Sequence, residues 1–250
     1  MRVEAKPAPD WPEGTGRIVL ASTGSTMEEG RVRAGTRPPP FWVLAHAQTG
    51  ARGRRGRPWL MPEGNFAATW VGEAPLATAP LLSFAAALAL RDALVAVRGA
   101  EGLSLKWPND VLLGGRKLAG ILLEGLPGGL VAVGVGVNLA AAPSAGDLPE
   151  GALPPAALDA PCWPETFLGL LAPAFARWEG VLRRQGFAPV RAAWLEGAAG
   201  LGGPIAVRLP GGTVRGTFRD LGADGTLVVG LPEGERRVAA GEVFLGGEGS

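Results

Sequence analysis

The chain has 250 residues, of which 47% are hydrophobic and 19% are charged. This composition is typical of a globular protein that buries a core, and it excludes an intrinsically disordered chain. The formal net charge of +1 also argues against a general nucleic-acid-binding protein, which would be far more basic.

The first half of the chain alternates short apolar strands with two helices. Residues 1–15 are expected to form a loose arm, and residues 22–29 a turn that opens into a helix. Ser25 or Thr26 can cap that helix, because a hydroxyl at a helix start accepts a hydrogen bond from a backbone N–H. We predict a second helix at residues 81–97, and strands at residues 17–21, 41–48, 65–71, 103–107, 111–113, 118–123 and 130–139.

The second half begins with a connection rich in Pro, Ala and Gly, at residues 140–162. Helices are predicted at residues 165–184 and 189–196. Gly200 to Pro204 is the best linker in the chain, and four or five short strands follow it, among them residues 213–218, 226–229 and 236–239. This pattern predicts a small barrel, so we divide the chain into domains at residues 1–199 and 200–250.

Three features bear on where the protein works. Cys162 is the single cysteine, so no intrachain disulfide can form and a reducing, cytoplasmic location is expected. Residues 1–6 lack the apolar core of a signal peptide. The longest uncharged apolar run, residues 74–90, contains two prolines and is followed by Arg91 and Asp92, so we expect a buried helix there and not a membrane span.

Lysine and asparagine are rare in this chain. There are 3 lysines beside 21 arginines, and 3 asparagines. Such a bias fits both a heat-adapted protein and a GC-rich coding sequence. Under either pressure, a lysine that remains marks a position where arginine has failed. Lys106, Asn109 and Lys117 lie within twelve residues of one another, which predicts a functional site there.

Residues 48–59 form a loop of glycines and arginines. Glycine lets the backbone approach a ligand closely and turn its N–H groups toward an anion, while arginine offers a planar fork of donors. The loop therefore predicts an anion site, with a solvated basic loop or an RNA-binding patch as the alternative. It is not a Walker A loop, because no Gly-x-x-x-x-Gly-Lys-Ser/Thr occurs in the chain.

Two further segments carry candidate chemistry. Residues 106–124 hold Lys-Trp-Pro-Asn-Asp and then Arg-Lys-Leu-Ala-Gly-Ile-Leu, around a Gly114-Gly115 hairpin turn. A plain hairpin would explain the Pro, Asn and Gly residues, but it would not explain two of the rare lysines. Residues 134–138, Gly-Val-Gly-Val-Asn, form a strand whose glycines allow close approach and which ends on a rare asparagine.

Taken together, these segments resemble the biotin–protein ligase family. The family's loop Gly-Arg-Gly-Arg-Arg-Gly-Arg before a Trp matches residues 51–59, and its Lys-Trp-Pro-Asn-Asp is intact at 106–110. Its Arg-Lys-Leu-Ala-Gly-Ile-Leu stands at 116–122 and its Gly-x-Gly-x-Asn at 134–138, in the same order, and Ser25-Thr26 matches its Ser-Thr. The resemblance implies an α+β fold: a mixed β-sheet catalytic domain with flanking helices, and a small C-terminal SH3-like β-barrel.

The activity that the resemblance implies is activation of biotin with ATP to biotinyl-5′-AMP, followed by transfer to a lysine of the biotin carboxyl carrier protein of acetyl-CoA carboxylase. Mg²⁺ would accompany ATP, and no metal site of the protein's own is expected. The implied catalytic residues are Lys117, Arg52, Arg54 and Asp110. The implied biotin-binding residues are Ser25, Thr26, Gln48, Arg52, Gly120 and Lys117. The implied nucleotide-binding residues are Arg54, Arg55, Arg57, Trp59, Asn109 and Asn138.

Some positions depart from the family pattern. Ala51 replaces the first glycine of the loop, and Met27 stands where the family often has Asn. Only about 15 residues precede the first strand, too few for the DNA-binding domain that some members carry, so no specific DNA partner is expected. No membrane partner is expected either, because the apolar run at residues 74–90 is predicted to be a buried helix. A homodimer is compatible with the resemblance. The alternatives are a lipoate or octanoate ligase, which shares the catalytic fold, and an RNA-binding protein that uses the arginine loop.

Overall fold

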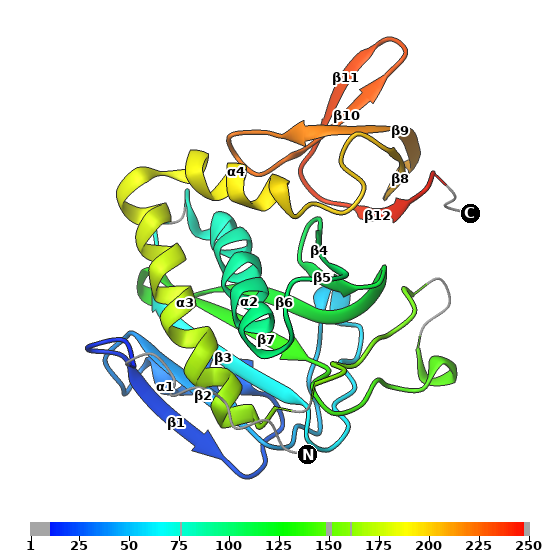
Figure 1. Ribbon diagram of the computed structural model, residues 1–250. Helices are drawn as coiled ribbons and strands as arrows, with labels where there is room; N and C mark the ends of the chain where they lie inside the picture. Colours follow the sequence, from blue (N-terminus) through cyan, green and yellow to red (C-terminus); the bar gives the residue numbers. More distant parts are fainter. Residues whose placement is uncertain (1–10, 76, 149–151, 161, 248–250) are drawn as a thin grey trace.

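A seven-stranded sheet forms the centre of the catalytic part of the chain (Figure 1). The computed structural model describes residues 11–75, 77–148, 152–160 and 162–247. The strand order is β1-β2-β3-β7-β6-β5-β4, with β1 parallel to β2 and every other neighbour antiparallel. The strands are β1 (Gly16–Leu20), β2 (Phe41–Ala45), β3 (Phe66–Glu73), β4 (Leu103–Lys106), β5 (Asp110–Leu113), β6 (Arg116–Leu126) and β7 (Leu130–Val137).

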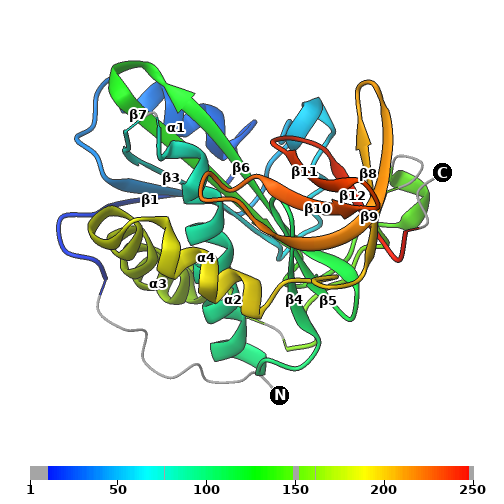
Figure 2. The same ribbon diagram turned by 90° about the horizontal axis from the view of Figure 1, so that it is seen from above.

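Helices cover both faces of this sheet. One face packs against α2 (Leu82–Arg98) and α3 (Pro164–Gln185), which in turn contact α4 (Phe187–Glu196). The other face packs against α1 (Thr26–Ala34), over a small cluster that includes Phe41 and Val71. Because both faces are covered, β2 is buried along its whole length, which explains its continuous apolar run. Figure 2 shows α1 on the side opposite to α2 and α3.

The apolar helix expected near residue 81 is α2. It is long and apolar enough to cross a membrane, but most of its apolar window is buried inside the protein. Leu88, Leu90 and Leu94 are among the largest fully buried side chains. Here, therefore, α2 is a core helix, as the two prolines before it and the charges within it had indicated.

A second, five-stranded antiparallel sheet follows the linker, in the order β11-β10-β9-β8-β12. Its strands are β8 (Pro204–Leu209), β9 (Gly212–Leu221), β10 (Leu227–Leu231), β11 (Gly234–Val238) and β12 (Glu242–Leu245). Within the described residues the outer strands β11 and β12 do not pair, so the predicted small barrel is an open five-stranded sheet. The reason lies in β11, which is exposed and charged at residues 235–237 and has little apolar surface with which to close a core.

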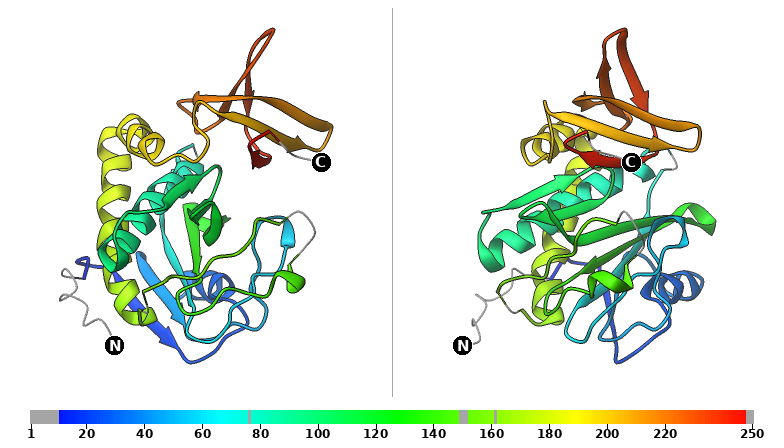
Figure 3. Two further views of the ribbon diagram at one scale, coloured as in Figure 1. Left: turned by 45° about the vertical axis from the view of Figure 1, so that its right-hand side comes forward. Right: turned by 90° about the vertical axis from the view of Figure 1, so that its right-hand side faces the viewer.

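The second sheet lies over one end of the catalytic part (Figure 3), and several polar contacts hold it there. The indole N–H of Trp107 donates to the carbonyl of Gly225 at 3.1 Å. Nε of Arg191 donates to the carbonyl of Leu221 at 2.6 Å. Apolar residues of both sheets also form one continuous core. Since these contacts lie on one side of the catalytic sheet, they bring β12 to the mouth of the pocket described next.

The elements predicted from sequence are confirmed, with ends that differ by a few residues. The fold class, a mixed sheet with flanking helices and a small C-terminal β domain, is confirmed as well. The predicted arm lies largely outside the described residues, as does Lys6.

Candidate active site

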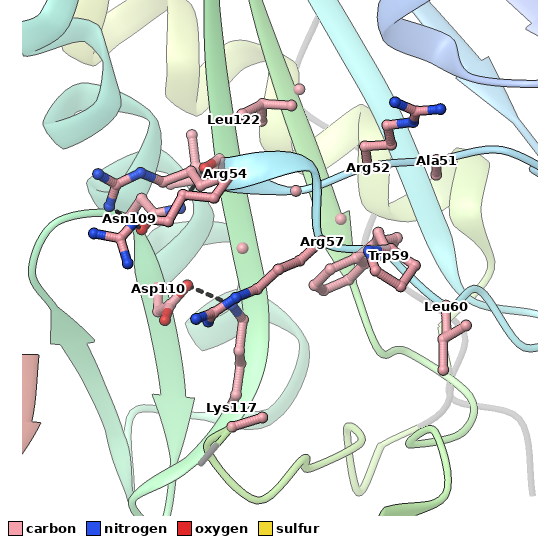
Figure 4. Close-up of a pocket in the computed structure, with 18 of the residues that line it drawn as sticks. Ala51, Arg52, Arg54, Arg57, Trp59, Leu60, Asn109, Asp110, Lys117 and Leu122 are labelled. Atoms are coloured by element: carbon pink, nitrogen blue, oxygen red, sulfur yellow. Dashed lines mark hydrogen bonds and ion pairs between the residues drawn. The ribbon is translucent and has the colours of Figure 1, made fainter. Parts of the chain in front are cut away.

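One pocket gathers every residue that the sequence nominated (Figure 4). Strands β5, β6 and β7 form its floor, the arginine loop at residues 51–59 crosses it, and residues 241–244 of the second sheet close one side. The nominated residues that line it are Ser25, Thr26, Gln48, Arg52, Arg54, Arg55, Arg57, Trp59, Asn109, Asp110, Lys117, Gly120 and Asn138.

One end of the pocket is polar and rigid. The backbone N–H of Thr26, the first residue of α1, donates to Oε1 of Gln48 at 2.7 Å. The hydroxyl of Thr26 accepts a hydrogen bond from the buried Thr69 hydroxyl at 2.9 Å. Ser25 is the N-cap residue but makes no side-chain cap hydrogen bond. The side chain of Gln48, which is distant in the sequence, accepts the hydrogen bond from the start of the helix instead. The amide of Gln48 is thereby held in one orientation.

The arginine loop folds back on itself. Arg52 and Pro58 form an isolated antiparallel bridge, and the N–H of Trp59 donates to the carbonyl of Ala51 at 3.0 Å. Ala51 is not among the residues with positive φ, so its methyl group is accommodated without strain. Arg55, at φ 59°, is the one non-glycine residue in the left-handed region within the described chain. The tight turn therefore falls on Arg55, a position that no sequence signal marks.

Asn109 links the loop to the floor of the pocket. Its Nδ2 donates to the carbonyl of Ile121 at 2.6 Å, and its Oδ1 accepts from Nη1 of Arg54 at 3.4 Å. The Arg54 guanidinium is half-buried, and burial lowers the pKa of Arg54, as does the neighbouring charge of Arg55. Arg54 is thus a desolvated cation held over the strands (Figure 4).

Asp110 and Lys117 face each other across the β5–β6 ladder. Nζ of Lys117 lies 2.7 Å from Oδ1 of Asp110 (Figure 4). The ladder shifts register between Val111 and Leu112, so a β-bulge lies beside Lys117, where such bulges can re-aim a side chain. Asp110 is nearly buried, whereas Lys117 is partly exposed to the pocket. The cation can therefore move to an incoming anion more easily than the carboxylate can.

The Pro-rich connection, expected only to join two helical regions, holds two of the site residues. The N–H of Lys117 donates to the carbonyl of Pro154 at 2.8 Å, and the carbonyl of Lys117 accepts from the N–H of Ala156 at 2.8 Å. Nδ2 of Asn138 donates to the carbonyl of Ala156 at 2.9 Å, and the N–H of Leu158 donates to the carbonyl of Asn138 at 2.8 Å. Residues 154–158 thus act as an added edge that fixes Lys117 and Asn138.

One polar atom of the Asn138 side chain lacks a hydrogen-bond partner. Its Oδ1 is buried and has no hydrogen-bond partner among the described residues, although Asn138 lines the pocket. An unpaired buried acceptor costs free energy unless a ligand donates to it. Asn138 is therefore suited to receive an N–H group from a molecule in the pocket.

The glycines of β6 and β7 make room for side chains of the protein itself. A methyl group on Gly136 would lie 2.5 Å from the Trp59 ring, and one on Gly134 would lie 2.7 Å from Sδ of Met27. Gly120 has the same ring 3.4 Å from its virtual Cβ. These glycines were expected to let a ligand approach the backbone. They also leave room for the Trp59 indole against the strands, where it forms a wall of the pocket.

Lys106, Glu242 and Phe244 line the pocket but were absent from the sequence-based set of site residues. Lys106 is 4% exposed and lies opposite Asp110 in the β4–β5 ladder, and burial lowers the pKa of Lys106 while Asp110 opposes that shift. The rarity of lysine singled out Lys106 in the sequence, but no role in the site was assigned to it. Glu242 and Phe244 come from β12, more than a hundred residues away from the nearest motif, and no sequence signal marks them.

Within the described residues, no group of three or more His, Cys, Asp or Glu side chains could hold a metal ion. The carboxylates that line the described part of the pocket, Asp110 and Glu242, are each paired with a cation. His46, the single histidine, lies outside the pocket and pairs with Glu165 at 3.0 Å. The pocket is therefore built for anions, with cations supplied by Arg and Lys.

Comparison with known proteins places the chain among others with this arrangement. The family model for the Biotin/lipoate A/B protein ligase family matches residues 18–138, and the model for the Biotin protein ligase C terminal domain matches residues 200–246. A biotin–[acetyl-CoA-carboxylase] ligase from Paracoccus denitrificans is 49% identical over 92% of this chain and 100% of its own length.

Solved structures agree with the fold. A mutant biotin protein ligase from Aquifex aeolicus in complex with biotin superposes with a TM-score of 0.78, at 21% identity, over 92% of this chain and 98% of the other. The ligase from the same organism in complex with biotin and ATP gives a TM-score of 0.76, at 23% identity, over 92% of this chain and 97% of the other.

Proposed function

Because the chain belongs to the Biotin/lipoate A/B protein ligase family, we propose that it is a biotin–protein ligase, which activates biotin with ATP and transfers it to a carrier lysine. One observation carries the proposal. A single pocket joins a rigid polar end, built on Gln48 and Thr26, to a cationic end where the arginine loop faces Lys117 and Asp110. A molecule with a hydrogen-bonding head and a carboxylate tail matches these two ends.

In the first step, a carboxylate oxygen of biotin attacks the α-phosphorus of ATP. The bond from that phosphorus to the bridging oxygen breaks, and pyrophosphate leaves. Charge builds on the phosphoryl oxygens, so fixed cations lower the barrier most. Lys117 lies at the cationic end, and we assign it to the carboxylate and α-phosphate. Arg52 and Arg54 serve the carboxylate and phosphate region, and MgATP is the substrate form.

In the second step, the amine of the carrier lysine attacks the acyl carbon of biotinyl-5′-AMP. The bond from that carbon to the phosphate oxygen breaks, AMP leaves, and a proton passes from the amine to a base. We assign Asp110 as that base or as the group that orients the amine. Its carboxylate lies at the floor of the pocket, next to the ammonium that would bind the phosphate.

The nucleotide end rests on three residues. The Trp59 ring offers a flat face at the pocket wall, and Oδ1 of Asn138 offers an acceptor for the amino group of adenine. Both polar atoms of the Asn109 amide already form hydrogen bonds with protein groups, so we assign Asn109 to support the nucleotide through Arg54. On the biotin side, Ser25 lies beside Thr26, and Gly120 lies beside Lys117.

The remaining assignments follow from this function. Residues 1–199 act as the catalytic domain and residues 200–250 as the C-terminal domain. The carrier is the biotin carboxyl carrier protein of acetyl-CoA carboxylase, and the compartment is the cytoplasm. The proposal includes neither a DNA partner nor a membrane partner, and sedimentation velocity tests whether the assembly is a homodimer.

Isothermal titration separates the proposal from its rivals. Biotin should bind with a one-to-one stoichiometry and lipoate should not, since the polar end of the pocket is built for a hydrogen-bonding head. A lipoate or octanoate ligase would reverse the two results. An RNA-binding protein would bind neither acid.

A further inference from the structure

Glu242, on strand β12 of the second sheet, forms an ion pair with the arginine loop. Nη1 and Nη2 of Arg57 donate to Oε1 and Oε2 of Glu242 at 2.8 Å and 3.0 Å, and Nη1 of Arg55 lies 3.6 Å from Oε2. This parallel two-bond geometry is the strongest that a guanidinium and a carboxylate can form. Glu242 thus holds two of the four arginines of the loop.

The two partners differ in their surroundings. The Glu242 side chain is 19% exposed and lines the pocket, whereas the Arg57 side chain is 44% exposed. The hydrogen bonds from Arg57 hold the pKa of Glu242 below its ordinary value, and the charges of Arg208 and Arg55 act in the same direction. Glu242 is therefore an anion throughout the neutral range.

The two partners differ in how firmly they are held. Glu242 sits on β12, whose sheet is fastened to the catalytic part through Trp107 and Arg191. The loop has four cations in six residues, no acid of its own, and Arg55 in the left-handed region. Repulsion among these cations opposes the folded loop, and an anion beside them offsets it. Glu242 supplies that anion from a rigid platform.

Glu242 is unsuited to bind a nucleotide directly, because a carboxylate repels a triphosphate. Its partner is well placed to do so. Arg57 lines the pocket, and its side chain points toward Asp110 (Figure 4). Hydrogen bonding to Glu242 raises the pKa of Arg57, and the charge of Asp110 acts in the same direction. The link from the second sheet to the nucleotide therefore runs through Arg57.

We infer that Glu242 is a positioning residue for ATP: it holds Arg57, and with it the arginine loop, over the pocket. The inference rests on the proposed function for its ligand. The contact between Glu242 and the arginine loop is independent of the proposed function, and a measurement of the loop alone can test it.

The test compares Glu242→Gln with Glu235→Gln, a matched change on exposed β11 of the same sheet. Gln keeps the shape but loses the charge that fastens Arg57. For Glu242→Gln we expect KM for ATP to rise about tenfold, in line with the loss of a charge-assisted hydrogen bond, with kcat within about twofold and the Kd for biotin unchanged. Trypsin should cut the loop at its arginines faster than in the wild type. Glu235→Gln should match the wild type in all four measurements.

A double-mutant cycle with Arg57→Ala identifies the route. If Glu242 acts mainly through Arg57, Glu242→Gln raises KM for ATP much less in the Arg57→Ala protein than in the wild type, because only the longer contact with Arg55 is then left to lose. Fully additive effects would overturn the inference, as would an unchanged or lowered KM for ATP in Glu242→Gln. If the wild type releases no pyrophosphate with biotin, the proposed function fails. The trypsin rates alone then test the contact between Glu242 and Arg57, and equal rates in the wild type and Glu242→Gln would refute its effect on the loop.

Discussion

The ammonium of Lys117 lies 2.7 Å from Oδ1 of Asp110, so the cation and the base that the proposed reaction needs are held against each other. In the proposed reaction, an anion that draws Lys117 away would break this ion pair. Formation of the adenylate would then free the carboxylate for the second step, so that one ion pair would link the two half-reactions.

Lys117→Arg should slow adenylate formation although it keeps the charge. A guanidinium is planar and broader than an ammonium, and beside Asp110 and the bulge it cannot occupy the same point. A displacement of about 1 Å in a reacting group costs roughly a hundredfold in rate, and we expect a loss of that size. Pyrophosphate release measures it, with Lys6→Arg, at the lysine farthest from the motifs in sequence, as the control. Wild-type rates for both variants would make Lys117 a structural residue.

Asp110→Asn should impair transfer more than activation. The amide cannot accept the proton of the carrier lysine, and loss of a general base costs on the order of a hundredfold or more. Single-turnover transfer from the preformed biotinyl-5′-AMP complex isolates this step. The deficit should shrink as pH rises, because the lysine then loses its proton unaided. Exposed Asp147→Asn is the control. A deficit that stays constant with pH would leave Asp110 with an orienting role only.

Gly136→Ala should weaken ligand binding by displacing Trp59. The added methyl group would lie 2.5 Å from the indole ring, which must shift or lose its place on the pocket wall. Overpacking of this kind costs about 1–3 kcal/mol, and if that cost falls on ligand binding the affinity drops by roughly 5- to 150-fold. Titration with ATP and with biotin measures it. Gly125→Ala on β6 is the matched control, because its methyl group meets no atom within 4 Å. Equal affinities in the two variants would remove Trp59 from the site.

The Arg57–Glu242 contact should give the protein a defined response to acid. Since the pKa of Glu242 is lowered in the fold, its stabilising contribution is complete above the ordinary glutamate pKa and is lost as pH falls through the lowered value. Carboxyl-carbon NMR, with the signal assigned by Glu242→Gln, should show a midpoint below the ordinary glutamate value. Arg57→Ala should raise that midpoint toward the ordinary value. A wild-type midpoint at or above the ordinary glutamate value would contradict the Arg57–Glu242 ion pair.

Much of this site could be predicted from the sequence, since its motifs are local. Lys106, Asn109 and Lys117 stood out because the chain uses so few Lys and Asn residues. The strands and helices followed from apolar periodicity, which the structure confirms to within a few residues. All thirteen nominated residues line the pocket. Their individual roles stay predictions until the variants above are measured.

What could not be predicted depends on contacts between distant segments. Glu242 meets Arg57 only because the second sheet docks through Trp107 and Arg191, and nothing near residue 242 encodes that docking. The Pro-rich connection looked like a passive joint, yet its backbone pairs with Lys117. The small barrel was predicted from the spacing of the strands alone. Strand spacing carries no information about the charged residues of β11, which leave the sheet open.

The most direct test of the proposed function is biotin-dependent pyrophosphate release with transfer to an intact carrier domain. With ATP, Mg²⁺ and biotin, the protein should release pyrophosphate, and mass spectrometry should show the carrier gaining one biotinyl group on a single lysine. Omitting biotin should abolish both signals, and lipoate should not restore them. Absence of pyrophosphate release with biotin, or faster release with lipoate or octanoate, would contradict the assignment as a biotin–protein ligase.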